Sequence, residues 1–597
     1  MILLTQIKHF VKNSTIGPVA WMLYFYVKFL QHKWINSVCP SLIANIAHIL
    51  GIKYEVKIPL PKKWAQVINN SKSLSLNLPK INGLRVLLAT CYGFGETRMD
   101  LESILAKSLQ FRGAQVMSLV CNKSLPACDW NRYGNHNPFL GSYGPRMFAR
   151  TRLNTCRGCT HAILDLHKQI GIPQVFLSDF MHQDDLQRII RIVDSQPYET
   201  YDNFVYKDIK VGEHARSSVI RTLLRGTLEN DAYTRWVYRR YLISSMLLTD
   251  LTERLFTAVH PERVVAPHGV YVTHGTICEI ARKHGIPVIV YGIPYRKGTV
   301  WLSHEDSYHR TLVTEPTSQW EHLSLTPDQE RKLDTYLRSK LGGGRDYVNY
   351  HPNPIESKEI MMQELGLDSE RPIISLFTNV LWDAQIFYNF NAFDNMLDWL
   401  FQTINYFARR PELQLVIRIH PAEVKGGFVT NQPIVGEIKA QFPVLPENVK
   451  VISSESNLSS YTLAEISRAA LIYGTKMGLE IAIRGIPVIV AGETLNRGKG
   501  YTYDVENRDQ YFALLDRILD LPRNSPEMIT RARKFAYHLF FRRMIDFPLF
   551  EIIDKNPITS YNAKLKFQHL GELLPGNCPN LDVICKGILN KTPFVVD

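Results

Sequence analysis

The stretch IYGTKMGLEIAIRGIPVIVAG, residues 472–492, decides the fold of this chain. It has the pattern of a strand end, a glycine turn, a short helix and a second strand. Its hexapeptide GIPVIV, at 485–490, already occurs at 285–290. In both copies glycine can close a helix in a left-handed conformation, proline prevents further helix, and Val-Ile-Val suits a strand buried in a parallel sheet. The repeat therefore predicts two α/β units of one kind.

The sequence around both copies continues this pattern. LRVLLAT (84–90) is a near-continuous apolar run, followed by the turn CYGFGE and by a helical pattern that Gly113 can close. Further strands are expected at 261–269 and from residue 371. Strand–turn–helix–strand units build doubly wound domains, so the predicted fold class is α/β, with two Rossmann-like domains that face a cleft. The predicted parts are a helical preface at 1–79, Rossmann-like domains at 80–340 and 366–524, and a C-terminal helical tail at 525–597.

The amino-acid composition limits the kinds of binding partner and the cellular compartment that are expected for this chain. Among 597 residues, 69 Lys and Arg outnumber 56 Asp and Glu, which gives a net charge of +13 and suits an anionic partner. The basic residues form no block of the kind found in nucleic-acid-binding tails, so no nucleic acid is expected. Nine cysteines and no secretory signal predict a cytoplasmic protein. The apolar run at 16–27 is too short to span a bilayer, and either lies peripherally on an anionic inner membrane face or packs on the protein.

The start of the predicted helix after residue 473 is suited to a phosphate. Helix N-termini offer free backbone N–H groups and partial positive charge. Gly474 allows close approach, Thr475 can cap or donate, and Lys476 adds charge. Glu480, one turn further, has two acceptors that suit ribose hydroxyls. The alternative is an ordinary capped helix with a solvated Glu480.

Two further segments carry cations near expected strand ends. In RIHPAE (418–423), His420 ends a buried strand and can donate to a phosphate, and Arg418 shares its face because strand side chains alternate. In GETLNRGKGYTYD (492–504), three glycines with Arg497 and Lys499 suggest a flexible cationic loop over an anion. A satisfied core histidine and a plain surface loop are the alternatives.

Taken together, RIHPAE, YGTKMGLEIAIRGIPVIVAGETLNRGKGYTYD and LFTNVLWDAQIF resemble the capsular polysaccharide biosynthesis family, which includes Kdo-transferase-like proteins of the GT-B glycosyltransferase fold. The clear match covers 371–504, and it departs from the family pattern at Ile481, where alanine is common. The matched positions are His420, Pro421, Thr475, Gly478, Glu480, Gly485, Pro487 and Gly492.

The resemblance implies transfer of a sugar from a nucleotide-activated donor, in several relatives a CMP-sugar, to a glycan or lipid-linked acceptor during surface polysaccharide assembly. The C-terminal domain would hold the donor, with His420 on its phosphate and with Thr475, Gly478 and Glu480 near its nucleotide, and no cofactor would be required for catalysis. A glycerol-phosphate-type transferase and a non-catalytic polysaccharide-binding or export protein of the same fold remain open.

An inverting transfer would need a base from the N-terminal domain, within reach of the acceptor hydroxyl. Glu96 follows the first glycine turn and His268 ends a strand, and these two are the predicted catalytic residues. Asp100, His274 and Asp383 are further candidates.

Four cysteines have a spacing that suits a metal. Cys121, Cys128, Cys156 and Cys159 follow C-x6-C-x27-C-x2-C, and the last pair has the spacing with which two thiolates hold one Zn²⁺. A closed structural zinc site and four unlinked thiols are the two interpretations.

Overall fold

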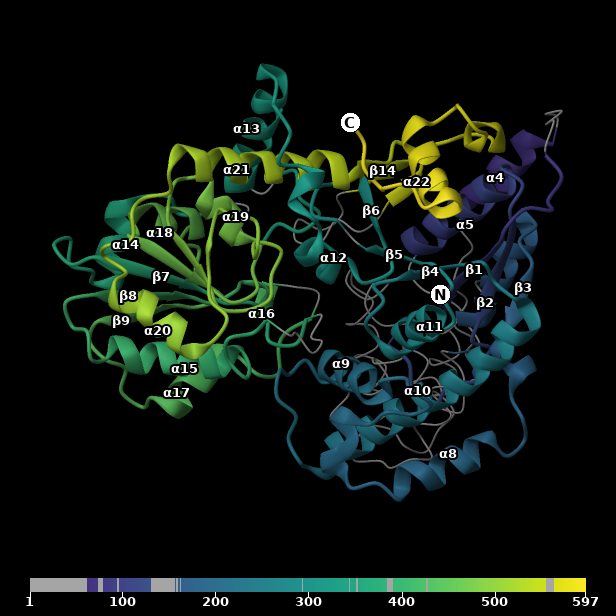
Figure 1. The fold of residues 1–597 in the computed structure, drawn as a ribbon, viewed down its shortest axis with the longest axis horizontal. Helices are drawn as coiled ribbons and strands as arrows, with labels where there is room; N and C mark the ends of the chain where they lie inside the picture. Colours follow the sequence, from purple (N-terminus) through teal and green to yellow (C-terminus); the bar gives the residue numbers. More distant parts are fainter. Residues whose placement is uncertain are drawn as a thin grey trace, which may run out of the picture.

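A computed structural model describes residues 62–72, 79–93, 96–129, 156, 159–161, 163–292, 294–342, 344–350, 353–383, 390–425, 428–553 and 563–597. The chain forms two α/β domains that lie side by side, the N-terminal one around β1–β6 and the C-terminal one around β7–β12 (Figure 1). The α/β fold class with two Rossmann-like domains is therefore confirmed. The predicted apolar run at 16–27 lies outside the described residues.

The N-terminal sheet has seven strands in the order β13-β6-β5-β4-β1-β2-β3. Strands β1–β5 are parallel to one another. At one edge β6 pairs antiparallel with β5, and β13 pairs antiparallel with β6. The strands are β1 (Arg85–Cys91), β2 (Gln115–Val120), β3 (Gln174–Phe176), β4 (Arg263–Pro267), β5 (Val288–Gly292), β6 (Thr299–His304) and β13 (Ile545–Asp546).

The C-terminal sheet has six strands in the order β12-β11-β10-β7-β8-β9, all parallel. In both sheets the order along the chain is third, second, first, fourth, fifth, which is the arrangement of a dinucleotide-binding sheet. The strands are β7 (Ile373–Phe377), β8 (Gln414–Arg418), β9 (Val449–Ile452), β10 (Ala469–Ile472), β11 (Val488–Val490) and β12 (Tyr503–Asp504).

The repeated hexapeptide supplies equivalent strands, because β5 and β11 are both the fifth strand of their domain. Gly285 and Gly485 have φ of 65° and 78°, the left-handed conformation in which glycine closes a helix. All residues of β5 and β11 are buried, as expected for parallel strands covered on both faces.

Helices connect the strands of each domain. In the N-terminal part these are α4 (Lys62–Ser71), α5 (Glu96–Gln110), η2 (Leu177–Phe180), α8 (Asp185–Asp194), η3 (Tyr198–Asn203), α9 (Val211–Leu223), α10 (Ala232–Val259), α11 (Val272–Lys283), α12 (Tyr308–Thr314), η4 (Thr317–Gln319) and α13 (Pro327–Gly342). In the C-terminal part they are α14 (Lys358–Leu365), α15 (Met396–Phe407), α16 (Ala422–Lys425), α17 (Ile434–Gln441), α18 (Ser460–Ile466), α19 (Met477–Ala482), α20 (Arg508–Asp516) and α21 (Pro526–Tyr537).

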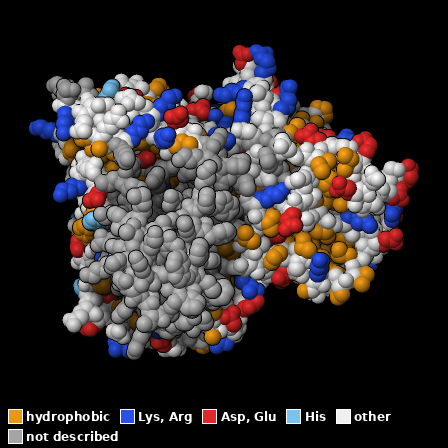
Figure 2. All heavy atoms as spheres, turned by 180° about the vertical axis from the view of Figure 1, so that it is seen from behind, with side chains coloured by type: hydrophobic (Ala, Val, Ile, Leu, Met, Phe, Trp, Pro, Cys, Tyr) orange, Lys and Arg blue, Asp and Glu red, His pale blue; other side chains and the backbone are white. Residues whose placement is uncertain are grey.

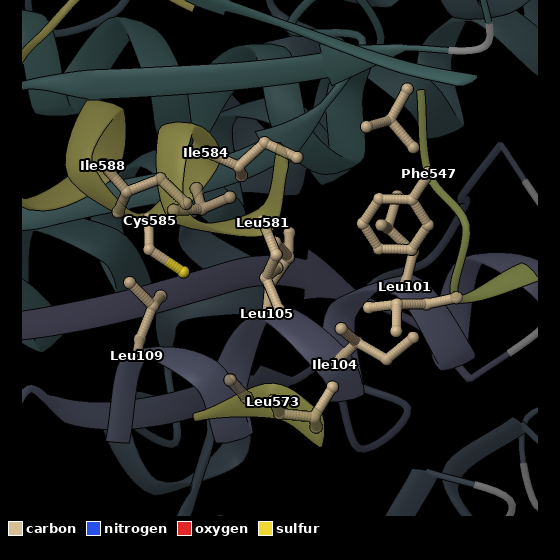
Figure 3. Close-up of a cluster of buried hydrophobic side chains, with 14 of the residues drawn as sticks. Leu101, Ile104, Leu105, Leu109, Phe547, Leu573, Leu581, Ile584, Cys585 and Ile588 are labelled. Atoms are coloured by element: carbon tan, nitrogen blue, oxygen red, sulfur yellow. The ribbon is translucent and has the colours of Figure 1, made fainter. Parts of the chain in front are cut away.

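The chain returns to the N-terminal domain after α21, which runs from one domain toward the other (Figure 1). The returning elements are η5 (His538–Arg543), β13, β14 (Phe550–Ile552), β15 (Ala563–Leu565), η6 (Leu570–Leu573) and α22 (Pro579–Asn590). β13 pairs with β6, and Leu581 and Ile584 of α22 pack on Leu105 of α5 in one buried cluster (Figure 3). The segment at 525–597, expected as a helical tail, is thus largely part of the N-terminal core, because its apolar side chains cover α5. The predicted domain boundaries stay a prediction.

The two domains touch where α9 ends. Gln432 Oε1 accepts hydrogen bonds from the main-chain N–H groups of Gly226 (2.8 Å) and Thr227 (3.1 Å). Asn431 donates from its main chain and its side chain to the carbonyl oxygens of Leu224 (2.9 Å) and Leu223 (2.8 Å). The C-terminal turn of α9 is therefore capped by a loop of the other domain.

On the face seen in Figure 2, basic and acidic side chains are interspersed over the described surface. None of the described helices is both long and apolar enough to cross a membrane.

Candidate functional site

The carboxyl ends of the central strands deliver the side chains of the candidate site. In each sheet the strand order reverses between the first and fourth strands, and ligands of open parallel sheets bind beside such a point. His268 follows β4 directly, and His420 lies just after the end of β8. His268 and Gly269 have φ of 53° and 69°, and these two left-handed residues turn the chain sharply from β4 toward α11.

Side chains from both domains meet in a group that we call the interdomain cluster: Arg221, His268, His309, Asp383 and His420. Arg221, on α9, forms an ion pair with Asp383, which lies in the loop after β7. Desolvation by the surrounding protein would raise the pKa of Asp383, although its side chain is 58% exposed, but Arg221 and the three histidines together hold that pKa below its usual range. The cluster thus places one ionised carboxylate among arginine and histidine side chains from both domains.

His420 is a neutral hydrogen-bond donor. Burial and the nearby Arg418 lower its pKa to about 4. Its Nδ1 accepts a hydrogen bond from the main-chain N–H of Ala422 (3.1 Å), so the ring proton is assigned to Nε2. The ring also packs edge-to-face on Tyr350, with centroids 5.4 Å apart. His420 is therefore held in the tautomer that can donate to a phosphate oxygen.

Arg418, predicted to bind the donor phosphate, donates its hydrogen bonds to other groups of the protein in this structure. Its side chain is 2% exposed and donates to the carbonyl oxygens of Ser453 (2.6 Å) and Ser456 (3.1 Å) and to Ser460 Oγ (3.2 Å). Burial lowers its pKa to about 10. Its place on the strand is as predicted, but the long side chain fixes the loop after β9.

Arg497 and Lys499 have the same kind of role. Arg497 donates to the carbonyl oxygens of Gly492 (3.4 Å) and Val505 (2.5 Å), which holds the glycine-containing loop together. Lys499 is 1% exposed and donates to two carbonyl oxygens at the C-terminal end of α12 (3.0 and 2.8 Å). Burial lowers its pKa to about 8. The loop expected to be flexible and cationic is thus anchored by its cations.

The predicted nucleotide residues Lys476 and Glu480 belong to a buried ion cluster with Lys340 and Asp346. Glu480 is 1% exposed, accepts a hydrogen bond from Tyr461 (2.6 Å) and lies 3.3 Å from Lys340 Nζ. Lys476 Nζ lies 3.1 Å from Asp346. A ribose contact by Glu480 would require displacement of these partners, so that role stays a prediction.

The remaining residues at the start of α19 serve packing and capping. The main-chain N–H of Gly474 donates to Asn379 Oδ1 (3.1 Å), and Thr475 Oγ1 accepts from the N–H of Met477 (3.2 Å). A Cβ on Gly478 would lie 2.5 Å from Ile472 Cδ1, so glycine is needed for close packing of α19 on β10. α19 itself has only six residues.

Glu423, next in the His-Pro segment, is a buried acid that sequence analysis did not single out. It is 1% exposed, and its Oε1 accepts a hydrogen bond from the N–H of Ile434 (3.1 Å). Burial raises its pKa to about 7. It fixes the loop that carries Asn431 and Gln432 to α9.

Of the two predicted catalytic residues, His268 lies in the interdomain cluster, whereas Glu96 begins α5 and its side chain lies outside the described residues. Burial and the neighbouring Arg98 and Arg221 lower the pKa of His268 to about 3. His274 is 1% exposed, with its ring centroid 6.1 Å from that of His268. Asp100 is buried against Trp64 Nε1 (2.7 Å), which gives it a structural role. Sequence reasoning missed Arg98, Arg221 and His309. Arg98 follows the glycine turn after β1, whereas Arg221 and His309 lie on helices and had no strand-end signal.

The predicted zinc cysteines line one small cavity of about 30 Å³, together with Cys91. The main-chain N–H of Gly93 lies 3.1 Å from Cys159 Sγ. Within the part of the chain that the structure describes, no three Cys, His, Asp or Glu side chains lie so that they could hold a metal ion. The structure therefore gathers Cys121, Cys128, Cys156 and Cys159 without ligating geometry, and the zinc site stays a prediction.

Comparison with known proteins yields structural matches alone. No family model matches the chain, and no curated protein does. The KpsC β-Kdo 2,4 transferase of Thermosulfurimonas dismutans is 13% identical, covers 53% of this chain and 87% of its own, and has a TM-score of 0.32. The UDP-GlcNAc 2-epimerase of Neisseria meningitidis is 13% identical, covers 76% and 98%, and has a TM-score of 0.23. The glycosyltransferase SnogD of Streptomyces nogalater is 13% identical, covers 77% and 96%, and has a TM-score of 0.20. Similarity at this level leaves the function to be argued from the chain's own residues.

Proposed function

We propose that this chain is a glycosyltransferase that uses a nucleotide-activated sugar, of the CMP-sugar type, in the synthesis of a capsular or other surface polysaccharide. The observation that carries the proposal is the interdomain cluster, where Arg221 pairs with Asp383 across the domains and three histidines act on Asp383 through charge. Two of them, His268 and His420, follow the carboxyl ends of strands in the two sheets. A transfer between two substrates needs reacting groups supplied from two sides, and two dinucleotide-type sheets that meet at these ends provide them.

On the donor side, His420 would hold the phosphate that leaves. Its Nε2–H can donate to a phosphate oxygen without a change in protonation, because its pKa of about 4 keeps the ring neutral. As the bond between the anomeric carbon and the phosphate oxygen breaks, negative charge grows on that oxygen. The Nε2–H of His420, whose ring is held in place by the hydrogen bond from Ala422, stabilises this charge more than it stabilises the oxygen of the intact bond.

On the acceptor side, His268 would take the proton from the attacking hydroxyl. Its pKa of about 3 makes it a weak base in the protein alone. A bound donor phosphate would add negative charge beside it, and a nearby negative charge raises the pKa of a histidine. Glu96 is the second candidate for this base. Donor binding would thus prepare the base for the acceptor, which is a glycan or a lipid-linked glycan.

A non-catalytic polysaccharide-binding or export role is the alternative, and one observation favours it. Arg418, Arg497 and Lys499, which could have bound phosphate, are used to hold loops. His420 and the interdomain cluster argue for the transferase, since they bring a carboxylate and nitrogen-containing side chains from both domains together. A glycerol-phosphate-type transferase would use the same phosphate donor contact.

Calorimetric titration of the full chain with CMP, CDP, UDP, GDP and ADP tests the proposal. We expect one nucleotide to bind in the micromolar range, and His420→Ala to weaken it at least about tenfold, because a hydrogen bond to a charged group is lost. His322→Ala is the matched control, since His322 is exposed and lies outside the cluster. If folded wild-type protein binds none of the five, the polysaccharide-binding role is favoured instead. Transfer from CMP-sugars, compared with CDP-glycerol, then separates the two transferases.

A further inference from the structure

One arginine beside the interdomain cluster forms no hydrogen bond and no ion pair with any residue that the structure describes. Arg98 lies in the first turn of α5, directly after the glycine turn that follows β1. Among the described residues it makes no hydrogen bond and no ion pair, and its Nη1 is buried. Its one described contact is with the ring of Tyr92, whose centre lies 4.9 Å from Cζ. Arg418, by contrast, donates to the carbonyl oxygens of Ser453 and Ser456.

The nearest acid does not neutralise Arg98. Glu102, one turn further along α5, accepts hydrogen bonds from Thr90 and Tyr291. Burial raises the pKa of Glu102 above its usual value against the opposing effect of Arg98, so Glu102 acts on Arg98 through its charge without a hydrogen bond or ion pair to it in the described structure. Desolvation of a charge without a counter-charge is costly, and proteins keep such groups where a ligand supplies the partner.

A second unused nitrogen lies close by. His274, on α11, is 1% exposed, and its Nδ1 finds no hydrogen-bond partner in the described structure. The rings of His268 and His274 have centroids 6.1 Å apart, and Arg98 lies in the helix that follows β1, the strand paired with β4, so all three residues belong to the edge at the ends of β1 and β4. The positive charge of Arg98 lowers the pKa of both histidines. The ends of β1 and β4 lie at the reversal of strand order in the N-terminal sheet, where open α/β sheets bind ligands.

We propose that Arg98, together with His274 and His268, binds a carboxylate or phosphate group of the substrate that lies on the N-terminal domain. The planar fork of a guanidinium matches either oxyanion with two parallel hydrogen bonds, and neutral histidines can add a third. The inference rests on the proposed function in that this substrate would be the acceptor, which would then be an acidic glycan or a phosphorylated one. The donor phosphate lies on the other domain, at His420.

The proposal makes a prediction about folding as well as binding. Because Arg98 forms no hydrogen bond or ion pair within the described residues, Arg98→Gln should leave the melting temperature unchanged or raise it. A structural arginine would behave in the opposite way, since its loss leaves acceptors unsatisfied. Arg85→Gln is the matched control: Arg85 begins β1 at the opposite edge of the sheet and is 40% exposed.

The test is the shift in melting temperature of the full chain with glucuronate, glucose 1-phosphate or glucose, at constant ionic strength. We expect one of the two acids, but not glucose, to stabilise wild type and Arg85→Gln. Arg98→Gln should bind that acid at least about tenfold more weakly, and Arg98→Lys should recover part of the loss. Glucuronate alone would identify a carboxylate, and glucose 1-phosphate alone a phosphate.

Two results would overturn the proposal: no shift with either acid, or an equal shift in Arg98→Gln. The nucleotide titration distinguishes a failure of the Arg98 site from a failure of the proposed function. Nucleotide binding that depends on His420, without acid binding, rejects the Arg98 site alone. Acid binding that depends on Arg98, without nucleotide binding, rejects the transferase and supports an anionic glycan as the bound polymer.

Discussion

Arg221 on α9 and Asp383 after β7 form an ion pair that joins one domain to the other, with side chains 23% and 58% exposed. Since Asp383 is accessible to water, the pair should be weak in spite of its position. A double-mutant cycle with Arg221→Met and Asp383→Asn should give a coupling of about 0.2–1 kcal/mol in chemical denaturation. A coupling above about 2 kcal/mol would mean that the pair is closed off from water.

Gln432→Ala should be more damaging than loss of that ion pair. Gln432 is 3% exposed, and its removal leaves the N–H groups of Gly226 and Thr227 without their acceptor. We expect a loss of about 1–3 kcal/mol in the free energy of unfolding, measured by urea titration. Gln441→Ala, at the exposed end of α17, is the control and should change it by less than about 0.5 kcal/mol. Equal effects would contradict the role of Gln432 in domain contact.

Glu423 should make stability depend on pH between about 4.5 and 7. Burial raises its pKa in the folded protein to about 7, from 4.5. The folded state therefore favours the protonated acid, so the stabilisation is complete below about pH 4.5 and is lost as the pH rises to about 7. The loss is about 3.5 kcal/mol at most, since one pKa unit corresponds to about 1.4 kcal/mol.

Melting temperatures of wild type and Glu423→Gln at pH 5 and pH 7.5 check this. The variant should lose stability less steeply than wild type across that interval, because its side chain does not ionise. Glu447→Gln, at an exposed position, should follow wild type. The interpretation fails if Glu423→Gln and wild type show the same slope.

Glu480→Gln should separate a structural role from a ribose contact. Loss of the carboxylate leaves Lys340, which is 9% exposed as a residue, with less counter-charge, and breaking a buried pair costs about 3–5 kcal/mol. Glu465→Gln, an exposed glutamate on α18, is the control. If stability hardly changes while nucleotide affinity falls tenfold, Glu480 contacts the nucleotide and not the ion cluster.

Local sequence patterns predicted the strands of both sheets because the conformational preferences for a turn and for a strand are local. A glycine that closes a helix, a proline and a β-branched run specify a parallel strand in both repeats, and the same reasoning placed His268 and His420 at strand ends. The loop at 492–504 was expected to be flexible over an anion, but Arg497 and Lys499 donate to carbonyl oxygens of the protein, and their phosphate contact stays a prediction. Partners such as Val505 for Arg497 and Val313 for Lys499 come from loops whose path no periodicity reveals.

Arg98 could have been found from its place after a glycine turn, but its lack of a partner could not. That property depends on the hydrogen bond that Tyr291, a residue 189 positions away in the sequence, donates to Glu102. The return of β13 was equally hidden, since two residues carry no strand pattern.

The cluster around Leu105, Leu581 and Phe547 also sets an order of events during synthesis. α5 emerges early from the ribosome, but the segments that cover it emerge only after the whole C-terminal sheet has been made. The second domain, whose strands β7–β12 are contiguous in sequence, can therefore complete its core while the first still exposes apolar surface. The half of the protein that is translated first is the half that finishes folding last, and until then it depends on protection from aggregation.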